Sequence, residues 1–305
     1  GALTLGDAAG PHALRFEAAS RETIPDDGAS DAVLRGPFQT TKTSATYQFV
    51  RDTRSSSGSG AGDLQKASVE VAGLLGDMAQ ARAEGFWTRT QPFFAGIWSI
   101  SAAAGFVVPL DDKEVTPWED RLFLGGALGA PGERLPGFAA HGVGPTDARK
   151  AAAMNGASPH HPEPVVEQRR GWRFGPQWQS QSTTFEVITG APVESAREPK
   201  VDHLGGDARA SVTASLQWPL PLPKAWGIQL QGLIMAAAGT LVEKARPASL
   251  FQDLAGQARA SVAAGIGAPL PSGGFVGLTV AHPLVAKASD ERQRCQFWLS
   301  LGSLL

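Results

Sequence analysis

Alternation of apolar and polar residues with a period of two is the feature that most constrains the fold of this chain. In the segment 208–218, Ala, Val, Leu and Trp occupy the even positions, and Arg, Ser, Thr and Gln occupy the odd positions. Successive side chains of a β-strand point to opposite faces, so this segment is expected to form a strand with one apolar and one polar face. The same alternation recurs along the chain and predicts an all-β protein.

The alternating segments predict about ten or eleven strands separated by turns. A composition of 36 Gly and 22 Pro with only 18% charged residues suits many short strands and turns. The expected strands lie near residues 13–21, 29–36, 42–49, 66–71, 79–85, 96–108, 208–218, 226–236, 259–266, 274–283 and 294–302, and turns are expected near 75–78 and 245–256.

Composition excludes several classes of protein. No apolar run approaches the roughly 18 to 20 residues of a membrane-spanning helix, but a membrane barrel crosses with two-faced strands and remains possible, as does a soluble sandwich or barrel. The near balance of 27 basic and 29 acidic residues provides no electrostatic footprint for nucleic acid. The single Cys295 excludes an internal disulfide and a multi-cysteine metal site.

Residues 120–145 carry three short motifs in a fixed order. They read Asp-Arg-Leu-Phe-Leu-Gly-Gly at 120–126, Leu-Pro-Gly-Phe at 135–138 and Gly-Val-Gly-Pro at 142–145. This order resembles the long sixth loop of the Omp85 barrel family, most closely that of its Sam50 branch in the mitochondrial outer membrane. Segments at 51–54, 69–76, 204–207 and 282–284 match in the same order. The loop residues singled out by the resemblance are Asp120, Arg121, Phe123, Gly125, Gly126, Arg134, Pro136, Gly137, Phe138, Gly144 and Pro145.

The resemblance implies that residues 1–305 form the C-terminal part of an antiparallel transmembrane β-barrel. The ten or eleven strands would belong to a barrel of sixteen, with a long loop and insertion at 111–203 and no POTRA domain. An open sheet edge in lipid leaves backbone groups unpaired. We therefore expect a partner or a missing segment to cover the N-terminal edge.

The loop tip departs from the family pattern. Relatives place an arginine at the position of Pro136, and this arginine pairs with an acidic residue on a neighbouring strand through a charge-assisted hydrogen bond. The acidic position aligns near Ala237, so both halves of this latch are expected to be missing. Arg134, two residues before Pro136, is the alternative position for a latch.

The alternation also predicts which side chains face lipid. We expect an apolar outer face and a polar lumen that includes Arg209, Thr213, Arg259 and Ser300. The side chains expected to face lipid are Val212, Leu216, Val262, Ile266, Leu299 and Leu301.

Other candidate sites carry weaker signals. His160, His161 and Glu163 suggest a metal site but lie in a proline-rich insertion, which favours a solvated loop. Arginines at 169, 170 and 173 alternate with aromatic residues, which fits either an interface or packing in the lumen. No residue pattern indicates an enzyme, so we expect no catalytic residue, no cofactor and no metal.

Two functions fit these features. The first is a Sam50-like barrel that assists insertion and assembly of β-barrel proteins in the mitochondrial outer membrane by adding a client strand at its edge. The second is a degenerate barrel that serves as a structural or interaction subunit of a larger complex. The expected partners are membrane lipid, other subunits of an assembly complex and β-barrel precursor clients, without nucleic acid. Plastid and bacterial outer membranes are the alternative locations.

Overall fold

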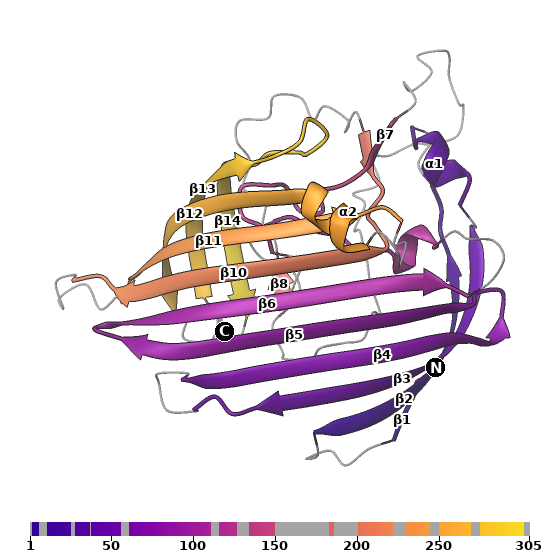
Figure 1. The fold of residues 1–305 in the computed structure, drawn as a ribbon, viewed down its shortest axis with the longest axis horizontal. Coiled ribbons are helices and arrows are strands. Elements are labelled where there is room, and N and C mark those ends of the chain that lie inside the picture. Colours follow the sequence, from indigo (N-terminus) through magenta and orange to yellow (C-terminus); the bar gives the residue numbers. More distant parts are fainter. Residues whose placement is uncertain are drawn as a thin grey trace, which may run out of the picture.

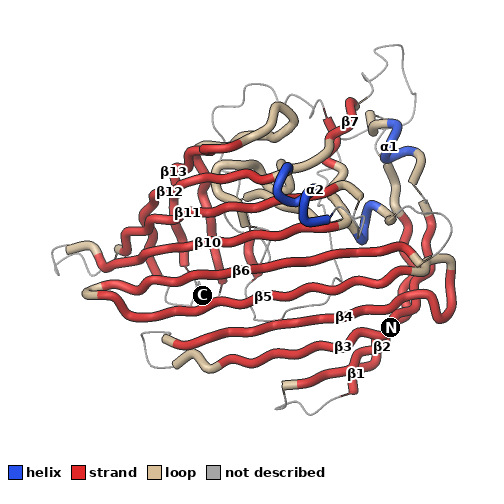
Figure 2. Tube along the Cα trace, in the orientation of Figure 1, coloured by secondary structure: helices blue, strands red, loops and turns tan. Residues whose placement is uncertain are grey.

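In this computed structural model, one curved antiparallel sheet makes up most of the protein (Figures 1 and 2). The structure describes residues 2–5, 11–25, 28–36, 38–55, 61–110, 116–126, 134–149, 183–185, 201–221, 230–244, 250–269 and 275–301. The sheet order is β1-β2-β3-β4-β5-β6-β10-β11-β12-β13-β14-β8, and a small second sheet pairs β7 with β9. The expectation of an all-β antiparallel barrel fold is confirmed.

Ten long or medium strands form the body of the sheet, and each pairs with its neighbours in antiparallel register. They are β2 (His12–Glu22), β3 (Gln39–Asp52), β4 (Gly62–Gly76), β5 (Gln80–Phe93), β6 (Gly96–Pro109), β10 (Ala208–Pro219), β11 (Gln231–Val242), β12 (Ala258–Pro269), β13 (Phe275–Val285) and β14 (Cys295–Leu301). The short strands are β1 (Ala2–Leu5), β7 (Thr146–Ala148), β8 (Thr183–Phe185) and β9 (Val201–His203).

The sheet does not close on itself among the described residues. Its two edges are β1, which pairs with β2, and β8, which pairs with the end of β14. Figure 1 shows β12 to β14 turning away from the plane of β3 to β6, so the sheet is curved around an interior. That a partner or a missing segment covers the N-terminal edge therefore stays a prediction.

The alternation of the sequence becomes an inner and an outer face. On β3, Lys42, Ser44 and Thr46 are buried on the inner face, whereas Tyr47 is exposed on the outer face. On β4, Lys66, Ser68 and Glu70 are buried, and Val69 and Val71 are exposed. The exposed apolar and buried polar faces are the arrangement of a barrel whose outside meets lipid and whose inside is polar.

The structure contains short helices at the strand ends away from the β5–β6 turn (Figure 2). They are α1 (Asp31–Leu34), the 3-10 helix η1 (Trp118–Asp120) and α2 (Leu250–Gly256). No helix in the described part of the chain has the length and apolar character needed to span a membrane. The strand predicted near 29–36 is therefore wrong, because α1 lies within it. Of the turn predicted near 245–256, residues 250–256 form α2 instead, and 245–249 lie outside the described part.

Contacts with distant residues explain the helix at 31–34. The backbone N–H of Ser30 donates to Asp202 Oδ2 at 2.7 Å, and that of Ala32 donates to Asp147 Oδ2 at 2.9 Å. Both carboxylates come from the β7–β9 pair and satisfy amides that the start of a helix leaves free. Of the strand predicted near 226–236, residues 231–236 belong to β11 (Gln231–Val242), and 226–229 lie outside the described part.

Candidate functional site: the loop on the inner face

The loop between β6 and β10 packs its apolar side chains against the inner face of the sheet. Leu122, Leu124, Leu135, Phe138 and Val143 are each at most 1% exposed. They form one cluster with Val107 of β6 and with Ala237 and Leu241 of β11. The loop is therefore a packed core of the barrel interior.

Two inward-facing glycines make room for this core. A Cβ at Gly105 of β6 would lie 3.2 Å from Leu122 Cδ1, and one at Gly239 of β11 would lie 3.0 Å from Leu124 Cδ2. Side chains at these positions would push the loop from the wall, because close-packed interiors tolerate little added volume. Glycine at positions 105 and 239 therefore allows the loop to pack closely against the sheet.

Backbone hydrogen bonds fix the three motifs in order along the interior. Leu122 exchanges hydrogen bonds with Gly206 at 2.8 and 2.9 Å, and Val143 N donates to Leu124 O at 3.2 Å. The glycines of the first motif adopt the conformations that these turns require, with φ of 129° at Gly125 and 94° at Gly126. A Cβ at Gly125 would lie 2.3 Å from a backbone oxygen, so this position accepts only glycine.

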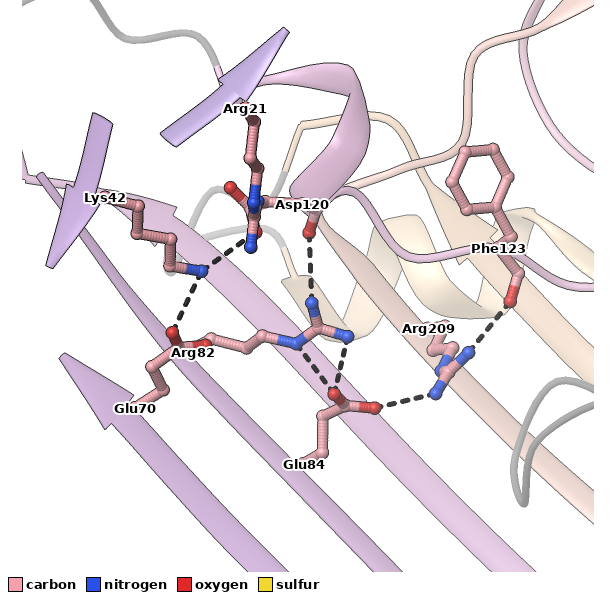
Figure 3. A network of polar contacts seen from close by, with 8 residues as sticks. All are labelled: Arg21, Lys42, Glu70, Arg82, Glu84, Asp120, Phe123 and Arg209. Carbon is pink, nitrogen blue, oxygen red and sulfur yellow. Dashed lines mark hydrogen bonds and ion pairs between the residues drawn. The ribbon is translucent and has the colours of Figure 1, made fainter. Parts of the chain in front are cut away.

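Asp120 ties the start of the loop to the first strands of the sheet (Figure 3). Its Oδ1 accepts from Lys42 Nζ of β3 at 2.9 Å and from Arg21 Nη1 of β2 at 3.1 Å. Lys42 also pairs with Glu70 of β4 at 2.9 Å. The side chains of Asp120 and Lys42 are 4% and 6% exposed, so a charged group inside the loop is held by the wall.

Arg82 and Arg209 continue this network across the sheet (Figure 3). Arg82 Nη2 of β5 lies 2.6 Å from Glu84 Oε1, and Arg209 Nη2 of β10 lies 2.7 Å from Glu84 Oε2. Arg209 Nη1 then donates to the carbonyl of Phe123 in the loop at 3.0 Å. With Glu119, which lies 3.9 Å from Arg21, the network holds four basic and four acidic side chains, so its charges balance.

The pKa of Asp120 follows from this setting. Burial alone would raise the pKa of its carboxyl, but the charges of Lys42 and Arg21 outweigh burial and hold the pKa below its ordinary value of 3.8. Burial instead raises the pKa of the neighbouring Glu119. Asp120 therefore remains ionised over the range in which the protein would work.

Arg121 holds the two ends of the loop together, and Phe123 packs at the first of these ends. Arg121 donates to the carbonyls of Thr116 and Leu204, both at 3.2 Å. Phe123 is 1% exposed and its ring makes an edge contact with Trp118, with centroids 5.8 Å apart. The loop thereby leaves and rejoins the sheet at one place.

The loop tip lies against the last hairpin. Gln296 Nε2 of β14 donates to Phe138 O at 2.7 Å, and a Cβ at Gly137, whose φ is 89°, would contact Pro283 of β13 at 3.3 Å. Phe138 also forms an isolated bridge with Arg292. The tip is therefore anchored by backbone groups and one amide side chain.

A second buried ion pair contacts the third motif of the loop. Arg259 of β12 binds Asp290 through two hydrogen bonds of 3.0 and 3.1 Å, and these side chains are 2% and 0% exposed. Asp290 Oδ1 also accepts from the amide of Gly144 at 3.4 Å. Pro145 O in turn accepts from Leu204 N at 3.0 Å. Arg259 thus helps to position the loop, which its predicted inward orientation did not by itself imply.

The expected latch positions are both buried. Pro136 is buried at the tip, and Ala237 is 5% exposed within the apolar cluster. Arg134 is half-buried, and burial lowers the pKa of its guanidinium. It also takes part in an interaction of its own, so it is not an exposed charge without a partner.

The structure places the predicted lipid-facing residues as follows. Val212, Val262 and Ile266 are exposed at 49%, 39% and 50%, and Leu216 is half-buried. Arg209 and Arg259 are buried on the inner face, and Thr213 is half-buried. The side chains of Leu299, Ser300 and Leu301 lie outside the described part, as do His160, His161, Glu163 and the arginines at 169–173. Contact with lipid remains a prediction.

The comparisons with known proteins agree with this architecture. The model of the Omp85 superfamily domain matches residues 12–303. A crystal structure of BamA from Haemophilus ducreyi lacking POTRA domains 1-3 is similar, with a TM-score of 0.60 and 14% identity over 98% of this chain. The match covers 53% of that structure, so this chain spans about half its length. At this identity the likeness shows the fold. No curated protein matches the sequence significantly.

Proposed function

Because this chain belongs to the Omp85 superfamily, we propose that it assists the insertion and assembly of β-barrel proteins in an outer membrane. The observation that carries the proposal is the docked loop beside a sheet that does not close among the described residues. The loop contacts β14 through Gln296, and β14 is the last strand of the body of the sheet. Among the described residues, β8 pairs only with Leu299–Leu301 of β14, which leaves 295–298 without a strand on that side. A client strand that adds there would gain main-chain hydrogen bonds, and no covalent chemistry is required.

The finer placement in the mitochondrial outer membrane is also a proposal. It is supported by the resemblance of residues 51–54 and 120–126 to the Sam50 branch. The plastid and bacterial outer membranes are the alternatives, and fractionation of the source cells distinguishes them. Within any of these membranes the expected partners are lipid, other subunits of an assembly complex and precursor clients.

Reconstitution tests the proposed activity. The full chain is incorporated into phospholipid vesicles, and a urea-unfolded β-barrel client is diluted into them. We expect the client to fold faster than in empty vesicles, with folding followed by its heat-dependent gel mobility. An equal rate in empty and loaded vesicles would contradict the proposal.

A structural role in a larger complex is the second candidate. The observation that favours it is that Pro136 and Ala237, the positions to which the resemblance assigns the two charges of the tip latch, are buried and carry no charge. This role predicts that the protein purifies in fixed stoichiometry with partner subunits and without precursors. Recovery of unfolded barrel precursors on the purified complex favours the assembly role instead.

A further inference from the structure

The outer face of β3, β4 and β5 becomes polar near the end that carries the β5–β6 turn. Arg51 of β3 lies opposite Gln65 of β4, and Asp63 of β4 lies opposite Arg89 of β5. Arg51 and Arg89 are exposed. Two arginines and one carboxylate thus occur on a surface whose other outward positions are largely apolar.

A pocket of about 160 Å³ lies within this polar surface. It is lined by Arg51, Thr53, Asp63 and Gln65. The backbone of Thr53 donates to Asp63 O at 2.8 Å, and its hydroxyl donates to the same oxygen at 3.0 Å. These bonds fix the spacing between the two strands, so the pocket is held by the sheet.

The pocket lies at the border of the apolar outer surface. Gln65 lies opposite Trp87 of β5, and the next outward row places Phe49 opposite Ala67. Further along β4, Val69 and Val71 are exposed at 49% and 46%. Aromatic side chains between an apolar band and charged groups mark the level of the lipid headgroups in a membrane barrel.

The charges around the pocket indicate which chemical groups it can bind. Arginine guanidinium groups bind phosphate through charge-assisted hydrogen bonds, and a carboxylate binds a primary ammonium group. The Arg89 guanidinium also contacts Gln91, whose Oε1 accepts from it at 2.8 and 3.0 Å in the amide orientation that satisfies both groups. Nearby Asp52 and Arg54 pair with each other at 2.8 Å, so they neutralise each other.

We propose that this pocket binds the headgroup of phosphatidylethanolamine. Arg51 in the pocket would hold the phosphate together with Arg89, which lies opposite Asp63 beside the pocket, and Asp63 would hold the ammonium group. A choline headgroup presents no N–H donor to Asp63, and a glycerol headgroup presents no positive charge. The pocket therefore selects a headgroup with a primary ammonium, while the acyl chains lie along the apolar surface of β4 and β5.

Lipid retention tests this site. The full chain is incorporated into vesicles of equal phosphatidylcholine, phosphatidylethanolamine and phosphatidylglycerol, extracted in mild detergent and measured by native mass spectrometry. We expect phosphatidylethanolamine to be enriched on the wild type. Arg51→Gln should reduce that enrichment about tenfold, the change expected when one charge-assisted hydrogen bond is lost. Arg89→Gln on the neighbouring strand should reduce it independently.

Matched variants show which part of the headgroup each side chain recognises. Asp63→Asn should remove the preference for ethanolamine over choline, whereas Arg35→Gln, an exposed arginine after α1, should change nothing. Heat-dependent gel mobility confirms that each variant is folded. The proposal is overturned by equal retention in wild type and Arg51→Gln, by preferential retention of phosphatidylglycerol, or by displacement of the lipid with millimolar inorganic phosphate.

Discussion

At the scale of single residues, the docking of the loop depends on charges at its base. Asp120 contacts Lys42 and Arg21, and the main chain at Phe123 accepts from Arg209. The sequence placed the basic and acidic residues of β3 to β5 on one polar face. It could not show which of them pair, because pairing depends on strand register, and the register between β3 and β4 shifts near Lys42.

Removing the charge of Asp120 should destabilise the loop. Asp120→Asn leaves the buried cations of Lys42 and Arg21 with a neutral partner, and disrupting a buried ion pair costs about 3 kcal/mol. Chemical unfolding in detergent should show this loss, and protease should cleave the loop sooner. Asp77→Asn, in the exposed turn after β4, is the matched control and should change the free energy of unfolding by less than about 0.5 kcal/mol.

The same contact predicts a dependence on pH. Because the pKa of folded Asp120 lies below its ordinary value of 3.8, its contribution to stability is present above pH 3.8 and is lost as pH falls through the lower folded pKa. Glu119, whose pKa is raised, acts in the opposite direction. Hydrogen exchange of residues 120–126, corrected for intrinsic rates, should show constant protection from pH 7 to 5 and a loss only in stronger acid. Loss of protection between pH 7 and 5 would contradict this origin.

At the scale of elements, strands were predictable and helices were not. Alternation located most strands of the sheet body, because most have one polar and one apolar face. In β11 the inward residues Ala237 and Leu241 are apolar as well, because the loop packs on them. The segment at 31–34 forms a helix because Asp147 and Asp202, distant in sequence, bind the amides at its start. The loop was predicted from its motifs, but its anchors on β12 and β14 depend on contacts that no local pattern encodes.

A glycine at the end of the loop tests how closely the loop fits the wall. Gly144 has a φ of 130°, and a Cβ there would lie 2.6 Å from Leu241 Cδ2 of β11. Gly144→Ala should therefore destabilise loop docking by about 2 kcal/mol, through backbone strain and overpacking. Gly85→Ala, where a Cβ meets nothing within 4 Å, is the control. Equal thermal stability of the two variants would show that the loop is not tightly packed.

At the scale of the whole molecule, the two faces of the sheet differ in polarity, and this difference determines the environment that each face can contact. The inner face buries ion pairs and the loop, while the outer face exposes Val212, Val262 and Ile266. This separation follows from period-two alternation. The covering of the sheet edges could not be predicted from it, since alternation carries no information about which strands meet.

An arginine placed on each face tests the lipid contact. Val212→Arg puts a charge in the centre of the outer face of β10 and should cost about 2–4 kcal/mol if that face meets the bilayer core. Thr213→Arg, one residue further and on the inner face, should cost much less. Unfolding is measured in lipid vesicles. Equal losses for the two variants would show that the outer face does not lie in the membrane.

Disulfide trapping at Cys295 tests the central claim most directly. Cys295, the only cysteine of the chain, is exposed at the start of β14. A client with a single cysteine moved through its last strand is mixed with the full chain in vesicles, and Cys295→Ser serves as the control. We predict a cross-link at one register position or at alternate positions, as expected for a client strand paired with the β14 edge. Absence of cross-links at every position, or cross-links of equal strength at all of them, would contradict strand addition at this edge.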